Sequence, residues 1–294
     1  MALSQIETPF VRLVTIILLS VFAAPLAAQT TVYDTARQVH WATAAFFGTG
    51  WYRVSANREA FIFRVPPRQV LREPGWDERG ERRLGIELFY PLAFGLHRLE
   101  DAPDFIDFDN YGTITFTPGV AVEIPLSDRW QLRPHAHFGV GYERTSNEWA
   151  RIYYGGIRSR YRLAENEDRS VALLGAISYA GYKPDYDVRG QYGSALVGFE
   201  GSHRSGRLSL DGAPARLNWH LTYSYLFDRL QFHVSPDEVV SVRDEWELGL
   251  ALARDGGKIR FGLLGFEQVG LAFTTSSNGA YRAITVNLRS PFTR

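Results

Sequence analysis

The stretch Thr113-Ile-Thr-Phe-Thr-Pro-Gly-Val-Ala-Val-Glu-Ile124 decides the fold class of this chain. Its apolar side chains and its proline fall on even positions, whereas threonine, glycine, alanine and glutamate fall on odd ones. A period of two predicts a β-strand with one apolar face and one polar or small face. The next stretch, Trp130-Gln-Leu-Arg-Pro-His-Ala-His-Phe-Gly-Val-Gly-Tyr142, repeats the pattern after a tight turn at Leu126-Ser-Asp-Arg129.

Segments of this kind recur along the chain and are long. Strands of soluble β-sandwiches usually have about five or six residues, whereas a tilted strand needs about 9–11 residues to cross a membrane. A soluble periplasmic β-protein is the alternative, but length and pattern favour strands in lipid, whose backbone groups are all satisfied only in a closed barrel. The expected strands are 41–55, 59–70, 83–98, 111–124, 129–144, 148–163, 169–183, 187–201, 215–227, 239–253, 258–275 and 280–290.

The prediction is therefore an all-β protein, an antiparallel transmembrane β-barrel of about 12 strands, within a range of about 10–14. Both chain ends of such a barrel lie in the periplasm, so inner turns alternate with outer loops. The turn at 126–129 is then periplasmic, and the acidic loop 99–110 and the loop 228–238 lie outside. The connection 202–214 is long for an inner turn, and 258–275 requires a strand kinked at its glycines.

The first 28 residues predict a secretory signal peptide. Arg12 precedes an apolar run at 13–22, and a small-residue stretch follows it at 23–28. A run of about ten residues is too short for a membrane-spanning helix, which needs about 20. We therefore expect export to the bacterial outer membrane, a short N-terminal lead-in at 29–40 and a barrel domain at 41–294.

Composition excludes several other classes. The 294 residues carry 32 basic and 32 acidic side chains, so the net charge of zero gives no electrostatic footprint for nucleic acid. The absence of cysteine excludes thiol nucleophiles, redox pairs and cysteine-ligated zinc.

The polar faces of the expected strands are predicted to line the barrel interior. Their charges are balanced in sign, and we expect them to pair and to plug or narrow the lumen. One expected pair is Glu123 with Arg133, placed diagonally across the turn at 126–129. The alternative is a selectivity ring for anionic solutes, formed by an arginine ladder at 158, 160 and 162. The predicted lumen-lining residues are Glu87, Glu123, Arg133, His135, His137, Glu143, Arg158, Arg160, Arg162, Arg243, Glu245, Glu247, Arg260 and Arg289.

Aromatic residues near the ends of the apolar faces predict the two membrane girdles. They are Trp130, Tyr142, Trp219, Tyr225 and Trp246. The last expected strand leads to Phe292, which resembles the terminal aromatic of outer-membrane proteins that the assembly machinery reads, although two residues follow it.

The residues predict no catalytic site, no metal site and no cofactor. A hydrolase needs a nucleophile near a base that a third group orients. A loop cluster that could imitate a protease site comprises Asp228, His233, Asp237 and Glu238. His135 and His137 share one face and could begin a metal site with Glu143, but two imidazoles without a convincing third ligand are more often ordinary lumen residues.

The segments 117–130 and 133–142, together with the signal peptide and the absence of a passenger domain, resemble the solitary autotransporter-like outer-membrane barrels. The likeness covers nearly the whole mature chain and implies a barrel without catalytic residues. We therefore expect a non-enzymatic protein with a structural or surface-interaction role and a largely plugged polar lumen. A narrow passive diffusion channel for small solutes is the alternative, followed by an outer-membrane hydrolase. The expected partners are outer-membrane lipid, lipopolysaccharide and the assembly machinery.

Overall fold

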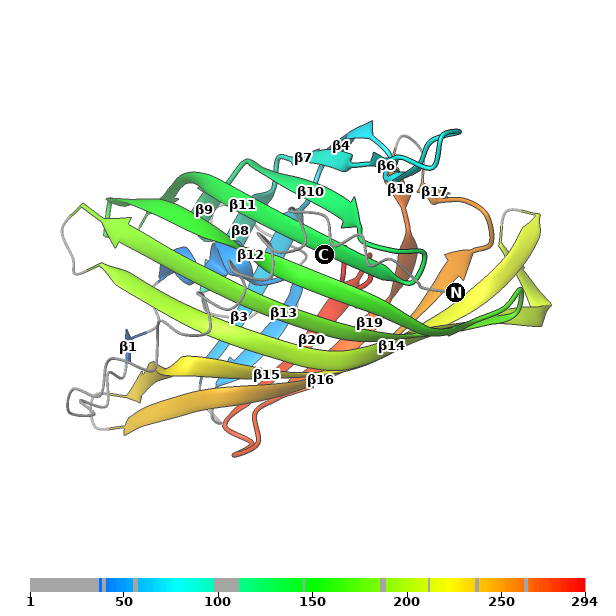
Figure 1. Cartoon of the computed structure of the whole chain (residues 1–294). Helices are drawn as coiled ribbons and strands as arrows, with labels where there is room; N and C mark the ends of the chain where they lie inside the picture. The colour runs from blue at the N-terminus through cyan, green and yellow to red at the C-terminus, as the bar shows by residue number, and fades with distance from the viewer. Residues whose placement is uncertain are drawn as a thin grey trace, which may run out of the picture. The chain divides into compact units, whose positions relative to one another are not determined.

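Among the described residues, twelve strands close into an antiparallel barrel in the computed structural model (Figure 1). The structure describes residues 37–38, 41–54, 58–97, 111–144, 146–185, 189–210, 212–235, 238–261 and 264–293. The ring closes because β20 pairs with β2, which confirms the predicted barrel and its strand number. The wall consists of β2 (Gly50–Val54), β3 (Arg58–Val65), β8 (Leu92–His97), β9 (Tyr111–Phe116), β11 (Trp130–Glu143), β12 (Glu148–Glu165), β13 (Arg169–Pro184), β14 (Gly190–Leu210), β15 (Ala213–Ser235), β16 (Glu238–Arg254), β19 (Gln268–Thr275) and β20 (Tyr281–Asn287).

Proline interrupts three wall strands, so that each predicted strand consists of two pieces in line. The additional pieces are β4 (Arg68–Arg72), β7 (Gly85–Phe89) and β10 (Gly119–Pro125). Proline has no N–H to donate to a ladder, but its carbonyl can still accept. The carbonyls of Pro67, Pro91 and Pro118 accept from the N–H groups of Tyr90, Thr117 and Phe138. The neighbouring strands therefore stay connected across each break.

The predicted first strand at 41–55 is wrong in its first half. Residues 41–46 form a 3₁₀ helix, η2 (Trp41–Phe46), and β2 begins only at Gly50. Apart from Thr43, the stretch 41–47 is apolar on both parities, so it has no polar face to turn toward a lumen. The helix lies inside the ring instead, with Ala42 and Ala45 fully buried.

Two connections differ from their predicted form because they are hairpins. β14 and β15 continue past the ring and pair as far as Leu210 with Ala213, and Gly212 before Ala213 has a φ of 76°. The stretch 258–275 is not one kinked strand, because β17 (Ile259–Phe261) and β18 (Leu264–Phe266) pair with each other and β19 follows. Another small hairpin, β5 (Gly75–Trp76) with β6 (Arg82–Arg83), connects β4 to β7. All three lie at the end of the barrel that carries the turn 126–129, here called the turn end.

Asp255 ties the extended hairpin of β14 and β15 to the rest of the turn end. Its carboxylate accepts a hydrogen bond of 2.9 Å from Arg216 and lies 3.0 Å from Nε of Arg204. The hydrogen bond from Arg216 holds the pKa of Asp255 below its usual range. The tie is therefore complete above the unfolded-chain pKa of about 3.9 and is lost as the pH falls through the lower folded-state pKa.

We expect Asp255→Asn to loosen this hairpin at neutral pH. Tryptic cleavage after the exposed Arg207 should be several-fold faster than in the unchanged barrel at pH 7. In the unchanged barrel, hydrogen exchange at 204–210 should accelerate, after correction for its intrinsic pH dependence, only below about pH 4. Equal cleavage rates in the two proteins would show that Asp255 does not hold the hairpin.

At the opposite end, here called the loop end, β8 and β15 end and β9 and β16 begin. The tight turn at 126–129 and the region 228–238 lie at opposite ends, as predicted, but the predicted loop at 228–238 is wrong in extent, because residues up to Ser235 belong to β15 and pair with β16. The acidic loop 99–110 lies outside the described residues. Along β20, residues alternate strictly between buried and exposed, so one face points into the ring and the other away from it. Within the described residues, no helix is long and apolar enough to span a membrane.

Candidate functional site

The interior of the barrel is the candidate site, and its loop end holds an apolar plug. Helix η2 contacts the inner side of β12 and β13, where Ala42 and Ala45 pack with Ile152 and Tyr182. Phe46 makes edge-on contacts with Tyr154 at 5.2 Å and with Tyr192 at 5.8 Å between ring centroids. A second apolar cluster fills the neighbouring space and comprises Tyr52, Val54, Ile62, Ala93, Leu226, Leu230, Val242, Tyr281 and Ala283. The sequence predicted a polar lumen, and this half of it is apolar.

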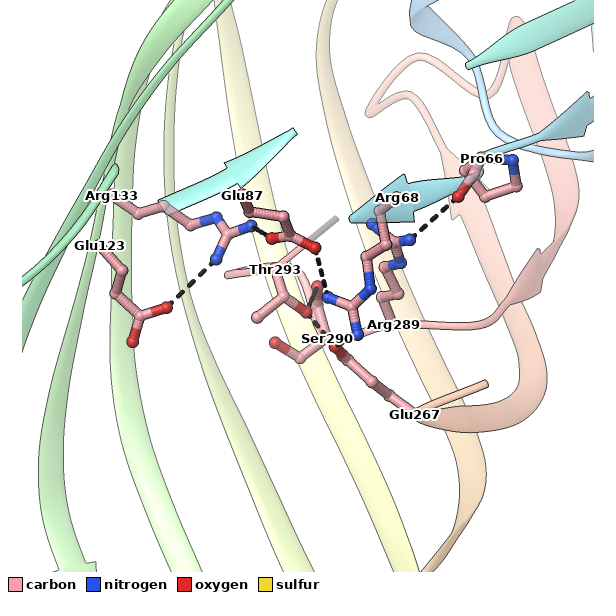
Figure 2. A network of polar contacts seen from close by, with 9 residues as sticks. All are labelled: Pro66, Arg68, Glu87, Glu123, Arg133, Glu267, Arg289, Ser290 and Thr293. Carbon is pink, nitrogen blue, oxygen red and sulfur yellow. Dashed lines mark hydrogen bonds and ion pairs between the residues drawn. The ribbon is translucent and has the colours of Figure 1, made fainter. Parts of the chain in front are cut away.

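The turn end holds a network of charged side chains (Figure 2). Arg133 on β11 is bound by two carboxylates, Glu87 on β7 and Glu123 on β10, the latter at 3.2 Å. Arg68 on β4 lies 2.7 Å from Glu87 and 2.5 Å from Glu267, which precedes β19. Because Arg133 and Glu87 are both buried, each charge depends on its partners for the solvation that water would otherwise give.

The pair of Glu123 and Arg133 is present, but its register differs from the predicted one. The pairing of Ala121 with His135 and of Ile124 with Leu132 places Glu123 directly opposite Arg133 rather than diagonal to it. Arg133 also pairs with Arg158 on its other side, so two like charges are neighbours in the ladder. The two carboxylates at Arg133 offset that repulsion.

The same network connects two parts of the wall that no ladder joins. In the described chain, β4 is hydrogen-bonded to β7 only and ends the sheet there. Across this edge, Arg68 reaches Glu267, and Arg289 donates to the carbonyl of Pro66 at 3.1 Å (Figure 2). β2 is too short to pair along the whole edge of the closing strand β20. Side-chain contacts close the ring in the remaining part of this edge, beside β4.

The last described residues form a second plug at the turn end. β20 ends at Asn287, and Phe292 is only 2% exposed. Its side chain lines a cavity with interior residues such as Arg158 and Glu245, while Thr293 donates to Glu267 at 2.9 Å. Phe292 therefore lies beyond the last strand and inside the ring, and its reading by the assembly machinery stays a prediction.

Most of the other predicted lumen residues lie along the interior with partners that sequence reasoning missed. Arg160 lies 2.7 Å from Glu200, and the ring of His220 lies 2.8 Å from Glu247. Glu200 and His220 both lie on the inward face of strands whose alternation is visible in the sequence. The sequence does not show which inward side chains meet across neighbouring strands, so these two pairs were not predicted. A further interior contact is Asn218 with Gln268. Glu143 bonds to the exposed Ser146, and Arg162 pairs with the exposed Glu165.

Arg243 is not in the lumen, contrary to the prediction. It is exposed, and its guanidinium lies 5.5 Å from the ring centroid of Tyr225 on the outer face. The reason is a register shift, since Tyr225 pairs with Asp244 but Leu230 pairs with Val242. The bulge turns Val242 inward and Arg243 outward. The side chain of Arg260 lies outside the described residues.

The predicted girdle residues lie on the outer face. Trp130 at the turn end and Tyr225 and Trp246 at the loop end are exposed, and Tyr142 and Trp219 are half-buried. Between these levels the outer face is apolar. Its large exposed side chains include Phe138, Ile157, Ile177, Val197, Phe199, Leu221, Leu248, Leu250, Leu271, Phe273 and Ile284.

The alternatives of catalysis and metal binding gain no support from the geometry. His135 and His137 are neighbours with ring centroids 6.0 Å apart, but His137 stacks on Tyr154 and Glu143 is bound to Ser146. In the described part of the chain, no group of three or more His, Asp or Glu residues is placed to hold a metal ion. The side chain of His233 lies outside the described residues.

A cavity of about 350 Å³ lies between the two plugs. Aromatic side chains of the loop-end plug line one side, and small residues line much of the rest. The charged residues in its lining are Arg64, Arg158, Glu245, Glu247 and Arg289. The sequence matches no protein-family model and no curated protein.

Proposed function

We propose that this chain is an integral outer-membrane β-barrel with a plugged lumen and a structural or surface-interaction role. The observation that carries the proposal is the inverted distribution of side chains. Large apolar residues are exposed over the outer face, while glutamate, arginine and histidine are buried inside. A soluble monomer rarely exposes so large an apolar surface, whereas lipid requires one. Aromatic residues at both ends of the apolar band support the same placement.

Lipopolysaccharide is the proposed lipid partner at the loop end. Two exposed arginines there lie over aromatic rings, Arg189 over Tyr153 and Arg243 over Tyr225, both at 5.5 Å. Arginine binds phosphate through two parallel hydrogen bonds and remains charged at all physiological pH values. Arginines held at the level of an aromatic girdle are well placed for lipid phosphates. A solitary autotransporter-like barrel is compatible with this arrangement, and the family assignment is part of the proposal.

The plugged lumen predicts an electrically silent barrel. Refolded protein that shows the heat-modifiable gel mobility of a folded barrel should give no steady openings in a planar bilayer, because η2 and the residues around Phe292 occupy the two ends of the lumen. Steady openings that decrease when Arg158, Arg160 or Arg162 is replaced by glutamine would establish the diffusion-channel alternative instead.

A further inference from the structure

The central cavity exists because three adjacent strands carry small inward residues. Ser178 on β13, Ser194 on β14 and Ser224 on β15 all line it. Ser178 and Ser194 are paired directly across their strands, so the row is continuous at that point. Leucine or phenylalanine at these positions would fill the space, as apolar residues do in the loop-end plug. The cavity volume of about 350 Å³ lies within the range of about 300–1,000 Å³ that is usual for ligand pockets.

Opposite charges stand at the two ends of this serine row. Arg158 on β12 lies at one end, and Glu245 on β16, which pairs directly with Ser224, lies at the other. Glu247 is already engaged, because it accepts from Thr274 and lies 2.8 Å from His220. Glu245, by contrast, makes no hydrogen bond or ion pair with another described residue. A carboxylate that faces an interior cavity without an ion-pair partner is stabilised when a cation binds beside it.

Aromatic rings complete the cavity on the side of the loop end. Phe46, Phe47, Tyr52, Tyr192 and Tyr281 all line it. Their faces can contact an apolar group and attract a neighbouring ammonium. The cavity thus combines a cation, a row of hydroxyl groups, an anion and an aromatic wall.

We propose that this cavity binds a small zwitterion whose ammonium and carboxylate stand at opposite ends of an aromatic or apolar group. The carboxylate of the ligand pairs with Arg158, its ammonium pairs with Glu245, the serine hydroxyls bind between them, and the apolar group contacts the rings. This site goes beyond the proposed structural role, since binding does not require conduction through the lumen.

The test is equilibrium dialysis of labelled 3-(4-(2-aminoethyl)phenyl)propionate, a zwitterion with its two charges on opposite sides of a ring, against barrel that was refolded with this probe present, so that the plugs do not limit access. We expect about one bound molecule per barrel. Phenethylamine and 3-phenylpropionate, which each lack one of the two charges, should bind at least about tenfold more weakly. Glu245→Gln and Arg158→Gln should each weaken binding of the zwitterionic probe by a similar factor.

Two further variants separate this site from a general effect on the barrel. Arg160→Gln removes a neighbouring interior arginine that faces Glu200 and a different cavity, so it should leave binding unchanged. Ser194→Leu should abolish binding while the heat-modifiable mobility is kept. The inference is overturned if folded barrel binds none of the zwitterionic probe, if the three probes bind equally, or if both charge variants bind as the unchanged chain does. Steady conductance would contradict the plugged-lumen proposal without affecting these outcomes.

Discussion

Arg133→Met is expected to destabilise the barrel by about 3–5 kcal/mol, because it removes the cation from two interior carboxylates. The Arg133 side chain is 4% exposed and is bound by Glu87 and Glu123. Methionine fills a similar volume, so the loss reports mainly the uncompensated charges. Urea titration of the refolded barrel in detergent, followed by gel mobility, measures the change in the free energy of unfolding.

Arg53→Met is the matched control for that experiment. Arg53 also forms an ion pair with a glutamate, Glu59, but its side chain is 59% exposed. Exposed pairs contribute about 0–1 kcal/mol, so this variant should unfold almost as the unchanged barrel does. Similar losses in the two variants would mean that water reaches the turn-end network and that it is not a buried plug.

The fold could be predicted because the two faces of most strands differ so clearly. In β11, the inward positions carry Arg133, His135 and Glu143, whereas Trp130 and Phe138 are exposed on the other face. A period of two survives in the sequence whatever the strand pairs with, so it fixes both the element and its faces. Where a bulge interrupts the period, as between Tyr225 and Leu230, the parity fails, which is why Arg243 was misplaced.

The candidate site could be predicted only in part, because its contacts depend on closure of the ring. Glu123 and Arg133 belong to one hairpin, and their proximity follows from a short turn. Arg68 and Glu267 are 199 residues apart and meet only because the last strands close on the first. Sequence periodicity contains no information about that junction. The plugs were missed for a related reason, since η2 and Phe292 are not in strands and their burial depends on the finished wall.

Leu248→Arg is the second variant with a large expected effect, because it tests whether the outer face is in lipid. Leu248 is 51% exposed on the outer face of β16 and lies beside Leu221 and Phe273 on the neighbouring strands. This row lies between the levels of the girdle residues Trp219 and Tyr225. Arginine near the middle of a bilayer costs a barrel about 2–4 kcal/mol. Refolding into phosphatidylcholine vesicles over a denaturant series measures this cost.

The chain supplies its own control in Leu208, which is 56% exposed on the part of β14 that extends past the ring. Its exposure is slightly greater than that of Leu248, so the two leucines differ in position and not in accessibility. Leu208→Arg should therefore cost less than about 1 kcal/mol, because this hairpin projects beyond the apolar band. If the chain were a soluble barrel, water would surround both side chains and the two substitutions would be equally harmless. A difference between them in vesicles thus separates an outer face in lipid from an outer face in water.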